Sequence, residues 1–450
     1  MREHRLKIGV SGIRGVVGEY LTPSLACAFA QAFGTYVGAG TVVLGRDSRS
    51  SGAMIQHAVA CGLLAAGCEV VDVGILPTPT IQIYAHDTGA RGGIAVTASH
   101  NPAEYNALKL FNHLGLFFNH YERSELIDLY HQSDFHHAAN DRIRSVRQER
   151  ETPVRVHFDR VLAHVDARAI RGRCFSVALD SVNGAGSRPS CQFLSSELGC
   201  DLHAISVDPS QPFPREAEPR PEVLTALSEK VRSSRCAVGF AQDPDGDRLA
   251  IADETGAVLD NDDVLALVVD AVLTRLPGDV VVNLTTSAAI DEIAARHGRK
   301  LWRTPVGEAN VVQRMQAVGA VIGGEGSGGG IIFPAVHYCR DSYTGMAFVL
   351  DHMAATGRTV SELAAGLPRF WRRFGKLAFE HGRLGPITQN LEREFQDAAV
   401  DRSDGLKLCW TDRWVHVRAS NTEPVLRIAA EARQESAAVE LFEKVMRLAG

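Results

Sequence analysis

Three aspartates alternate with a proline and a glycine in the run Asp243–Asp247. In an extended segment alternate side chains share one side, so we expect the three carboxylates to converge. Hard carboxylate oxygens on one face suit Mg²⁺, which leaves positions open for water or phosphate oxygens. An EF-hand is the competing interpretation, because Glu254 also has the required spacing. However, Arg248 stands where an EF-hand has glycine, and the flanks resemble strands. The pattern favours a magnesium site.

A serine stands where a strand is expected to end. The apolar run 93–96 passes into Thr97–Pro102, and the proline prevents a helix from continuing directly. We therefore expect Ser99 on a loop at a strand end, where α/β proteins often carry functional groups, with Lys109 ten positions further on. The alternative is an ordinary turn with a capping serine.

A glycine-rich run, Gly323–Gly330, follows an expected strand at 320–322. Glycine lets a backbone approach a ligand closely, and this run carries a carboxylate at Glu325 and a hydroxyl at Ser327. A carboxylate is a poor partner for phosphate, so the run suits sugar hydroxyls better. A flexible linker is the alternative.

A second polar loop, Arg418–Thr422, has a further arginine beyond it at Arg427. Guanidinium, hydroxyl and amide donors on one loop are suited to a phosphate dianion held by charge-assisted hydrogen bonds. A polar turn with a solvated arginine is the alternative. Near the N-terminus, Ser11–Gly15 places another arginine, Arg14, on a glycine-flanked turn.

The elements that must position these residues follow a repeating pattern of a β-branched strand, a polar loop and a helix. This pattern predicts related α/β layers, parallel where a crossover helix joins two strands. The expected strands are 41–44, 69–73, 93–96, 175–179, 236–240, 249–252 and 279–283, with a helix over 51–66 and a linker over 134–155. The last segment differs, since strands at 414–417 and 425–429 precede an amphipathic helix at 436–448.

The chain has 450 residues, which is too long for one core. We expect three similar α/β domains with mixed sheets and a smaller C-terminal α+β domain around a central cleft. The expected boundaries are 1–150, 151–256, 257–368 and 369–450.

The composition limits the partners. A net charge of −6 argues against nucleic acid. The nine cysteines form no Cys-x-x-Cys pair, which indicates a reducing compartment. No secretory apolar core follows the N-terminus, and no apolar run approaches the roughly 20 residues of a membrane helix, so we expect a cytoplasmic protein without a membrane partner.

Taken in order, five motifs resemble those of the α-D-phosphohexomutase family. They are the N-terminal turn Ser11–Gly15, the phosphoserine loop Thr97–Pro102, the metal loop Asp243–Arg248, the sugar loop Glu325–Gly328 and the phosphate loop Arg418–Pro424. The N-terminal turn departs from the family pattern because it lacks Phe-Gly-Thr before Ser11. Some members also carry a histidine at the position of Gly329, and His100 or His337 are the alternatives in this chain.

The resemblance implies an isomerase that interconverts hexose 6-phosphate and hexose 1-phosphate through a phosphoserine and a hexose 1,6-bisphosphate, which also serves as activator. Ser99, with Lys109, Arg14 and His100 nearby, is the implied catalytic group. The implied Mg²⁺ ligands are Ser99, Asp243, Asp245 and Asp247. The implied substrate-binding residues are Glu325, Ser327, Arg418, Ser420, Asn421, Thr422, Arg427 and Arg248.

Glucosamine phosphate is the expected substrate, with mannose or glucose phosphates as the alternative. A serine-dependent sugar phosphatase and an inactive sugar-phosphate sensor are the other hypotheses. A homo-oligomer is left open.

Overall fold

The computed structural model describes residues 7–9, 12–378, 382–420 and 425–450. The chain divides into two compact units. The first comprises residues 1–264 and 329–365, and the second comprises residues 265–328 and 366–450. Within the described residues, no helix has the length and apolar character needed to cross a membrane.

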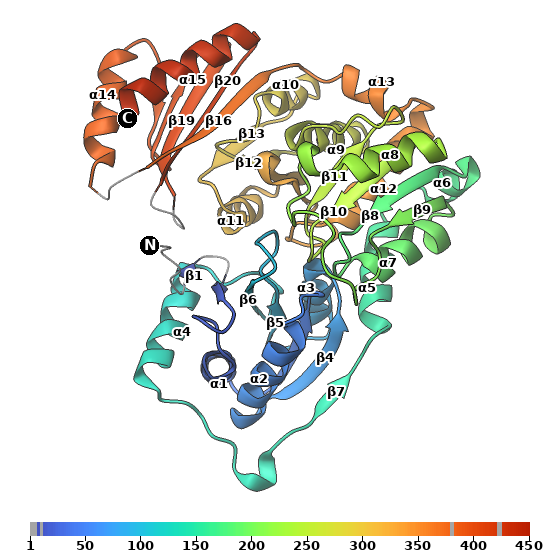
Figure 1. The fold of residues 1–450 in the computed structure, drawn as a ribbon, viewed down its shortest axis with the longest axis vertical. Helices are drawn as coiled ribbons and strands as arrows, with labels where there is room; N and C mark the ends of the chain where they lie inside the picture. The colour runs from blue at the N-terminus through green and yellow to red at the C-terminus, as the bar shows by residue number, and fades with distance from the viewer. Residues whose placement is uncertain (1–6, 10–11, 379–381, 421–424) are drawn as a thin grey trace. The chain divides into compact units, whose positions relative to one another are not determined.

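The first sheet is mixed and has the strand order β1-β2-β6-β5-β3-β4-β7. Its strands are β1 (Lys7–Gly9), β2 (Gly12–Val16), β3 (Thr41–Arg46), β4 (Glu69–Ile75), β5 (Gly92–Val96), β6 (Tyr105–Asn112) and β7 (Val146–Gln148). Its helices are α1 (Pro23–Val37), α2 (Gly52–Ala65), α3 (Thr78–Asp87) and α4 (His120–Gln132). Helices α1 and α2 pack against each other (Figure 1), and apolar residues such as Phe29 and Leu63 are fully buried there.

The second sheet is also mixed, with the order β11-β10-β8-β9. Its strands are β8 (Ser176–Asp180), β9 (Asp201–Ile205), β10 (Val238–Gln242) and β11 (Leu249–Ala252). Its helices are α5 (Thr152–Leu162), α6 (Ala167–Arg173), α7 (Ser187–Gln192) and α8 (Thr225–Ser234). Strand β10 is buried along its whole length, which fits its continuous apolar run, and it leads directly into the aspartate run.

The third sheet has the order β13-β12-β14-β15. Its strands are β12 (Val280–Asn283), β13 (Leu301–Thr304), β14 (Ile322–Glu325) and β15 (Gly330–Ile332). The helices of this region are α9 (Asn261–Arg275), α10 (Ala289–Arg296), α11 (Glu308–Val318), α12 (Ser342–Thr356) and α13 (Val360–Ala365). A 3₁₀ turn, Gly326–Gly328, follows β14.

The fourth sheet is antiparallel, with the order β16-β20-β19-β18-β17. Its strands are β16 (Trp371–Ala378), β17 (Ala399–Asp401), β18 (Leu406–Cys409), β19 (Arg413–Ala419) and β20 (Val425–Ala432). Helices α14 (Leu384–Glu394) and α15 (Glu435–Ala449) lie beside this sheet (Figure 1). They share one apolar core with it, in which Leu391 and Val445 are fully buried.

The expected fold class is confirmed as three mixed α/β sheets followed by an antiparallel sheet. Three local expectations were wrong. The linker 134–155 contains β7, which pairs in parallel with β4, and α5 begins within it. The glycine-rich run is not wholly a loop, because its first part forms β14. Arg418 lies within β19 and not on the loop after it.

Candidate active site

Ser99 lies on the loop between β5 and β6, as expected. Because these two strands are antiparallel neighbours, the chain returns past the loop and places Lys109 opposite Ala95 in the register. The Ser99 backbone has φ +51, a left-handed conformation that is uncommon for residues other than glycine. Its N–H donates to Thr97 Oγ1 at 2.9 Å. Strand pairing and this local bond together fix where the hydroxyl points.

Arg49 holds the same loop from the end of β3. Its guanidinium donates to the backbone carbonyl oxygens of Ser99 at 2.6 Å, Asn101 at 2.7 Å and Tyr105 at 3.0 Å. Asp47 orients Arg49 through a fully buried ion pair of 3.0 Å. Carbonyl groups of a buried loop need donors, and one planar guanidinium supplies several of them in fixed directions.

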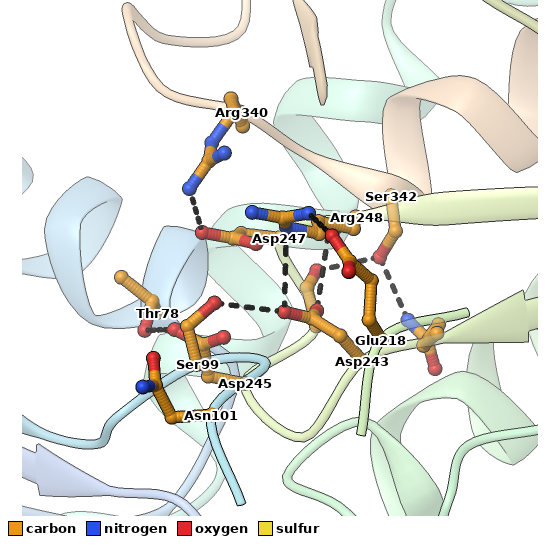
Figure 2. Close-up of polar contacts among 12 residues, drawn as sticks. Thr78, Ser99, Asn101, Glu218, Asp243, Asp245, Asp247, Arg248, Arg340 and Ser342 are labelled. Carbon is orange, nitrogen blue, oxygen red and sulfur yellow. Dashed lines mark hydrogen bonds and ion pairs between the residues drawn. The ribbon is translucent and has the colours of Figure 1, made fainter. Parts of the chain in front are cut away.

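The metal loop brings its three aspartates together, but not in the extended conformation that we expected. The residues after β10 form a turn, with Gly246 at φ +67. One ligand atom each of Asp243, Asp245 and Asp247 lies within 4.8 Å of the others. The Ser99 hydroxyl donates to Asp243 Oδ2 at 2.9 Å, so the expected phosphoserine and metal loops meet (Figure 2).

In Asp245 and Asp247, one carboxylate oxygen accepts hydrogen bonds and the other has no hydrogen-bond partner. Asp245 Oδ2 accepts from Thr78 Oγ1 and from Lys109 Nζ, both at 2.6 Å. Asp247 Oδ2 accepts from Arg340 Nη2 at 2.6 Å (Figure 2) and from Lys109 at 3.3 Å. The Oδ1 atoms of both aspartates are buried without a hydrogen-bond partner. Buried polar atoms normally have partners, so these oxygens fit a hard divalent cation.

The charges within the cluster interact strongly. Burial, followed by the carboxylates of Asp247 and Asp245, raises the pKa of Asp243 well above its ordinary value. Burial opposes the charge on Lys109, but Asp245 and Asp247 outweigh it, and the pKa of Lys109 is raised. Burial likewise opposes ionisation of Asp247, yet Arg340 and Lys109 lower its pKa below the ordinary range. A bound cation would relieve the repulsion that remains among the carboxylates.

Three further expected residues lie around this cluster. Arg14, on β2, donates to the Asn101 side chain at 2.5 Å. Arg248 donates to Glu218 at 2.6 Å and lies 3.9 Å from Asp243 Oδ2 (Figure 2). Arg248 and burial, with smaller contributions from Arg14 and Arg340, lower the pKa of His100 far below its ordinary range.

The expected alternative histidine, His337, is occupied elsewhere. Its Nε2 atom lies 3.0 Å from the carbonyl oxygen of Leu114, and its ring centroid lies 5.5 Å from that of His86, with the two rings tilted by 60°. Burial lowers the pKa of His337 to about 3. These contacts give His337 a structural environment.

The second unit carries the expected sugar-binding pair. Glu325 ends β14, and its Oε1 atom accepts from Asn283 Nδ2 at 2.9 Å and from the N–H of Gly307 at 2.8 Å. Ser327 lies on the 3₁₀ turn that follows and is exposed. A fixed carboxylate beside an exposed hydroxyl is suited to hydrogen bonding with a polyhydroxylated ligand.

The expected phosphate-binding residues lie on neighbouring strands of the same unit. Arg418 on β19 is directly opposite Arg427 on β20 in the register. Burial lowers the pKa of Arg418, which Asp404 and Glu325 partly offset. Ser420 is buried, with its N–H donating to the carbonyl oxygen of Val425 at 2.9 Å. Ser11, Asn421 and Thr422 lie outside the described residues.

Several contacting residues were missed from the sequence. They are Asp47, Arg49, Thr78, Asn101, Asn283 and Arg340. Arg49 and Thr78 lie just beyond the ends of β3 and β4, where loop residues of a parallel sheet often gather, and that position was the only available signal. No signal in the sequence pointed to Arg340, because 93 residues separate it from Asp247.

Family models match the chain in order. The phosphoglucomutase/phosphomannomutase α/β/α domains I, II and III match residues 5–137, 155–256 and 260–370, and the C-terminal domain of that family matches 387–448. Among solved structures, a family protein from Burkholderia thailandensis superposes with a TM-score of 0.84 at 26% identity, covering 98% of this chain and 97% of that one.

Full-length relatives are similar to this chain. A phosphoglucomutase/phosphomannomutase of Thermococcus kodakarensis is 37% identical over 98% of this chain and 97% of its own length. A probable phosphoglucosamine mutase of Methanopyrus kandleri is 36% identical over 96% and 95%. The chain belongs to the phosphoglucomutase/phosphomannomutase family of α-D-phosphohexomutases, and it is a phosphohexomutase, an isomerase.

Proposed function

We propose that this phosphohexomutase is a Mg²⁺-dependent phosphoglucosamine mutase that carries its phosphoryl group on Ser99. The observation that carries the proposal is the 2.9 Å hydrogen bond from the Ser99 hydroxyl to Asp243, within a cluster of three buried aspartates. A serine held against a metal-binding cluster is suited to bear a phosphoryl group that the metal helps to transfer.

Asp243, Asp245 and Asp247 would hold the metal together with an oxygen at Ser99. When bound, Mg²⁺ would neutralise charge on the transferring phosphoryl group. The unpartnered Oδ1 atoms of Asp245 and Asp247 support this ligand set. The opposite oxygens are held by Thr78 and by cationic side chains, so these two carboxylates are oriented before a ligand arrives.

In the forward half-reaction, a hydroxyl oxygen of the hexose monophosphate attacks the phosphorus on Ser99. The bond from phosphorus to Ser99 Oγ breaks, a bond to the sugar oxygen forms, and the sugar hydroxyl proton ends on Oγ. The hexose 1,6-bisphosphate then returns its other phosphoryl group to Ser99. Lys109, Arg14 and His100 are the proposed neighbours of this step, and the contact of Arg14 with Asn101 on the phosphoserine loop supports its inclusion.

The substrate would be held by residues of the second unit. Glu325 and Ser327 would bind sugar hydroxyls. Arg418, Ser420, Asn421, Thr422 and Arg427 would bind the phosphate that does not react, and Arg248 would contact the substrate from the metal loop. The pairing of Arg418 with Arg427 supports the phosphate assignment, because guanidinium groups on adjacent strands are suited to bind one phosphate through charge-assisted hydrogen bonds.

The preference for glucosamine phosphate rests on relatives. The probable phosphoglucosamine mutases of Methanopyrus kandleri and Thermococcus kodakarensis are 36% and 35% identical to this chain. The 37% identical phosphoglucomutase/phosphomannomutase favours mannose or glucose phosphate as the second candidate. A hexose 1,6-bisphosphate would prime unphosphorylated enzyme with either substrate.

The test is a substrate panel of glucosamine 6-phosphate, mannose 1-phosphate and glucose 1-phosphate, each with Mg²⁺ and the matching bisphosphate. Isomer and inorganic phosphate are measured in the same samples. We expect the highest kcat/KM for glucosamine 6-phosphate and isomer without net phosphate release. Preference for mannose or glucose phosphate would transfer the assignment to the second candidate. Net phosphate without isomer would instead indicate a sugar phosphatase, and binding without turnover a sensor.

The domain division 1–150, 151–256, 257–368 and 369–450 is part of the proposal, and the order and extents of the four family matches support it. All nine cysteines are free thiols, which supports a reducing compartment such as the cytoplasm. We keep the central cleft and a homo-oligomer as predictions.

A further inference from the structure

Arg340 reaches the aspartate cluster from a rigid backbone position. Residue 340 forms an isolated antiparallel bridge with Ile332. The next residue, Asp341, caps α12 and hydrogen bonds with the buried ring of His157 at 3.1 Å. A side chain on Gly330 would meet Arg340 Cδ at 2.3 Å, so the stem of the arginine fills the space that this glycine leaves. The guanidinium is therefore directed before any ligand binds.

Arg340 and Lys109 are the cations that contact the cluster most closely. Arg340 Nη2 lies 2.6 Å from Asp247 Oδ2, and Lys109 Nζ lies 2.6 Å from Asp245 Oδ2. The side chain of Arg340 is only 11% exposed, so water screens this charge weakly. A divalent cation that binds the three carboxylates is then repelled by the guanidinium of Arg340, which already pairs with Asp247.

The same charge has the opposite effect on a phosphoryl group. Ser99 contacts Asp243, and Arg340 contacts Asp247, so both side chains border one cluster (Figure 2). A dianionic phosphoryl group on Ser99 is attracted by a cation fixed there, whereas the metal is repelled. The positive charge of Arg340 therefore lowers the affinity of the aspartate cluster for the metal and stabilises a phosphoryl group on Ser99.

We propose that Arg340 is a positioning residue of the mutase site, which acts through Asp247 to weaken divalent-metal binding and to stabilise the phosphorylated form of Ser99. The proposal rests on the proposed function of Ser99 and the three aspartates. It assigns to the charge of Arg340 an effect on the site beyond the orientation of the Asp247 carboxylate.

The substitution Arg340→Gln separates charge from orientation. Glutamine keeps an amide donor, and Lys109 still donates to the same oxygen of Asp247 at 3.3 Å, so the carboxylate retains a partner. Arg340→Lys keeps the charge. Loss of the local fold would weaken both metal binding and phosphorylation, whereas loss of the charge alone changes them in opposite directions.

The first measurement is Mn²⁺ binding to unphosphorylated full-length protein, followed by electron paramagnetic resonance, with Mn²⁺ standing for Mg²⁺. We expect Arg340→Gln to bind Mn²⁺ roughly tenfold more tightly than wild type and Arg340→Lys to stay within about twofold of it. Equal or weaker binding by Arg340→Gln would overturn the proposal, as would tighter binding by Arg340→Lys.

The second measurement is the phosphorylated fraction of Ser99 after equilibration with a hexose 1,6-bisphosphate at saturating Mg²⁺, read from the intact mass. In this step a sugar–oxygen bond to phosphorus breaks, a bond to Ser99 Oγ forms, and the serine proton passes to the sugar oxygen. We expect a lower fraction in Arg340→Gln than in wild type and Arg340→Lys. An equal or higher fraction would contradict the proposal.

Arg160→Gln is the matched control, because Arg160 belongs to the same unit but pairs with Asp87 and donates to the carbonyl oxygen of Val336. It should leave both measurements unchanged, and changes like those of Arg340→Gln would overturn the proposal. Failure of wild type to bind Mn²⁺ would overturn the metal site and this inference together. If wild type binds Mn²⁺ but Ser99 takes no phosphoryl group, the proposed function is refuted. The Mn²⁺ measurement would still decide the effect of Arg340 on metal affinity.

Discussion

Lys109 in the first unit and Lys407 in the second are buried to nearly the same extent, with 2% and 3% of each residue exposed. Lys109 contacts two carboxylates, Asp245 at 2.6 Å and Asp247 at 3.3 Å, and its pKa is raised despite its burial. Lys407 donates to the carbonyl oxygen of Leu284 at 2.6 Å, and burial lowers its pKa to about 7. Similar burial is thus accompanied by pKa shifts in opposite directions.

This difference between the pKa values of Lys109 and Lys407 shows what keeps a buried lysine charged. A buried cation is retained at neutral pH when a carboxylate compensates it, and the aspartate cluster supplies several. Lys407 lies over the ring of Trp414 and near Arg303, which adds repulsion. The aspartate cluster therefore keeps Lys109 charged, whereas burial brings the pKa of Lys407 down to about 7. The following changes test this contrast, from the largest expected effect to the smallest.

Ser99→Ala should lower mutase turnover by about 10⁴-fold or more, since it removes the group that carries the phosphoryl. The folded structure should survive, because the Ser99 hydroxyl makes one hydrogen bond and the loop is held by Arg49 through backbone oxygens. Turnover and thermal unfolding are measured together, with the exposed Ser233→Ala as control. Retained turnover would remove Ser99 from the mechanism.

Lys109→Met and Lys407→Met should differ in their effect on stability without metal. Removing Lys109 takes from buried Asp245 its closest cation and from buried Asp247 one of two cations that pair with it. We therefore expect a loss of about 3–5 kcal/mol in the free energy of unfolding. Removing Lys407 takes away an unfavourable buried charge and one hydrogen bond, and we expect a change within about 1 kcal/mol. Denaturant unfolding of the metal-free proteins measures both. Equal losses would contradict the contrast.

Arg418→Ala should lower kcat/KM by an amount equivalent to about 1.5–3 kcal/mol, through loss of a charge-assisted contact with the phosphate that does not react. Mn²⁺ affinity should stay unchanged, because the metal ligands belong to the first unit. Arg402→Ala, which breaks an exposed ion pair with Glu392, is the control. Unchanged KM and kcat would discard the phosphate assignment of Arg418.

The pH dependence of the free energy of unfolding should reveal the lowered pKa of Lys407. Its folded pKa is about 7, whereas a solvated lysine has a pKa of about 10.4. Between these values the unfolded chain binds a proton that the folded chain has released, so stability rises with pH. Relative to Lys407→Met, we expect wild type to gain about 1–2 kcal/mol between pH 7 and about 9. Parallel curves for the two proteins would show that Lys407 stays charged.

Chain-local patterns allowed much of the fold and site to be predicted. Strand and helix periodicity indicated β3, β4, β5 and α2 of the first sheet and missed its other strands. The spacing of Ser99 and Lys109 follows from two paired strands joined by a short loop. The convergence of the aspartates was expected for the wrong reason, since a turn at Gly246 brings them together.

The remaining contacts depend on tertiary structure. Arg49 meets the phosphoserine loop from 50 residues away, and Thr78 meets Asp245 from 167 residues away. Strand β7 is too short and too exposed for its pairing with β4 to show as periodicity. Such contacts arise from how the elements pack, and spacing along the chain carries no record of them.

The central claim is that Ser99 carries a phosphoryl group between two positions of one sugar. The most direct test is to load the enzyme with an isotope-labelled phosphoryl group from a labelled hexose 1,6-bisphosphate, map the label by peptide mass, and add unlabelled hexose monophosphate with Mg²⁺. We predict label on Ser99 that passes to the sugar as isomer forms. Label on another residue, or label released as inorganic phosphate without isomer, would contradict the account.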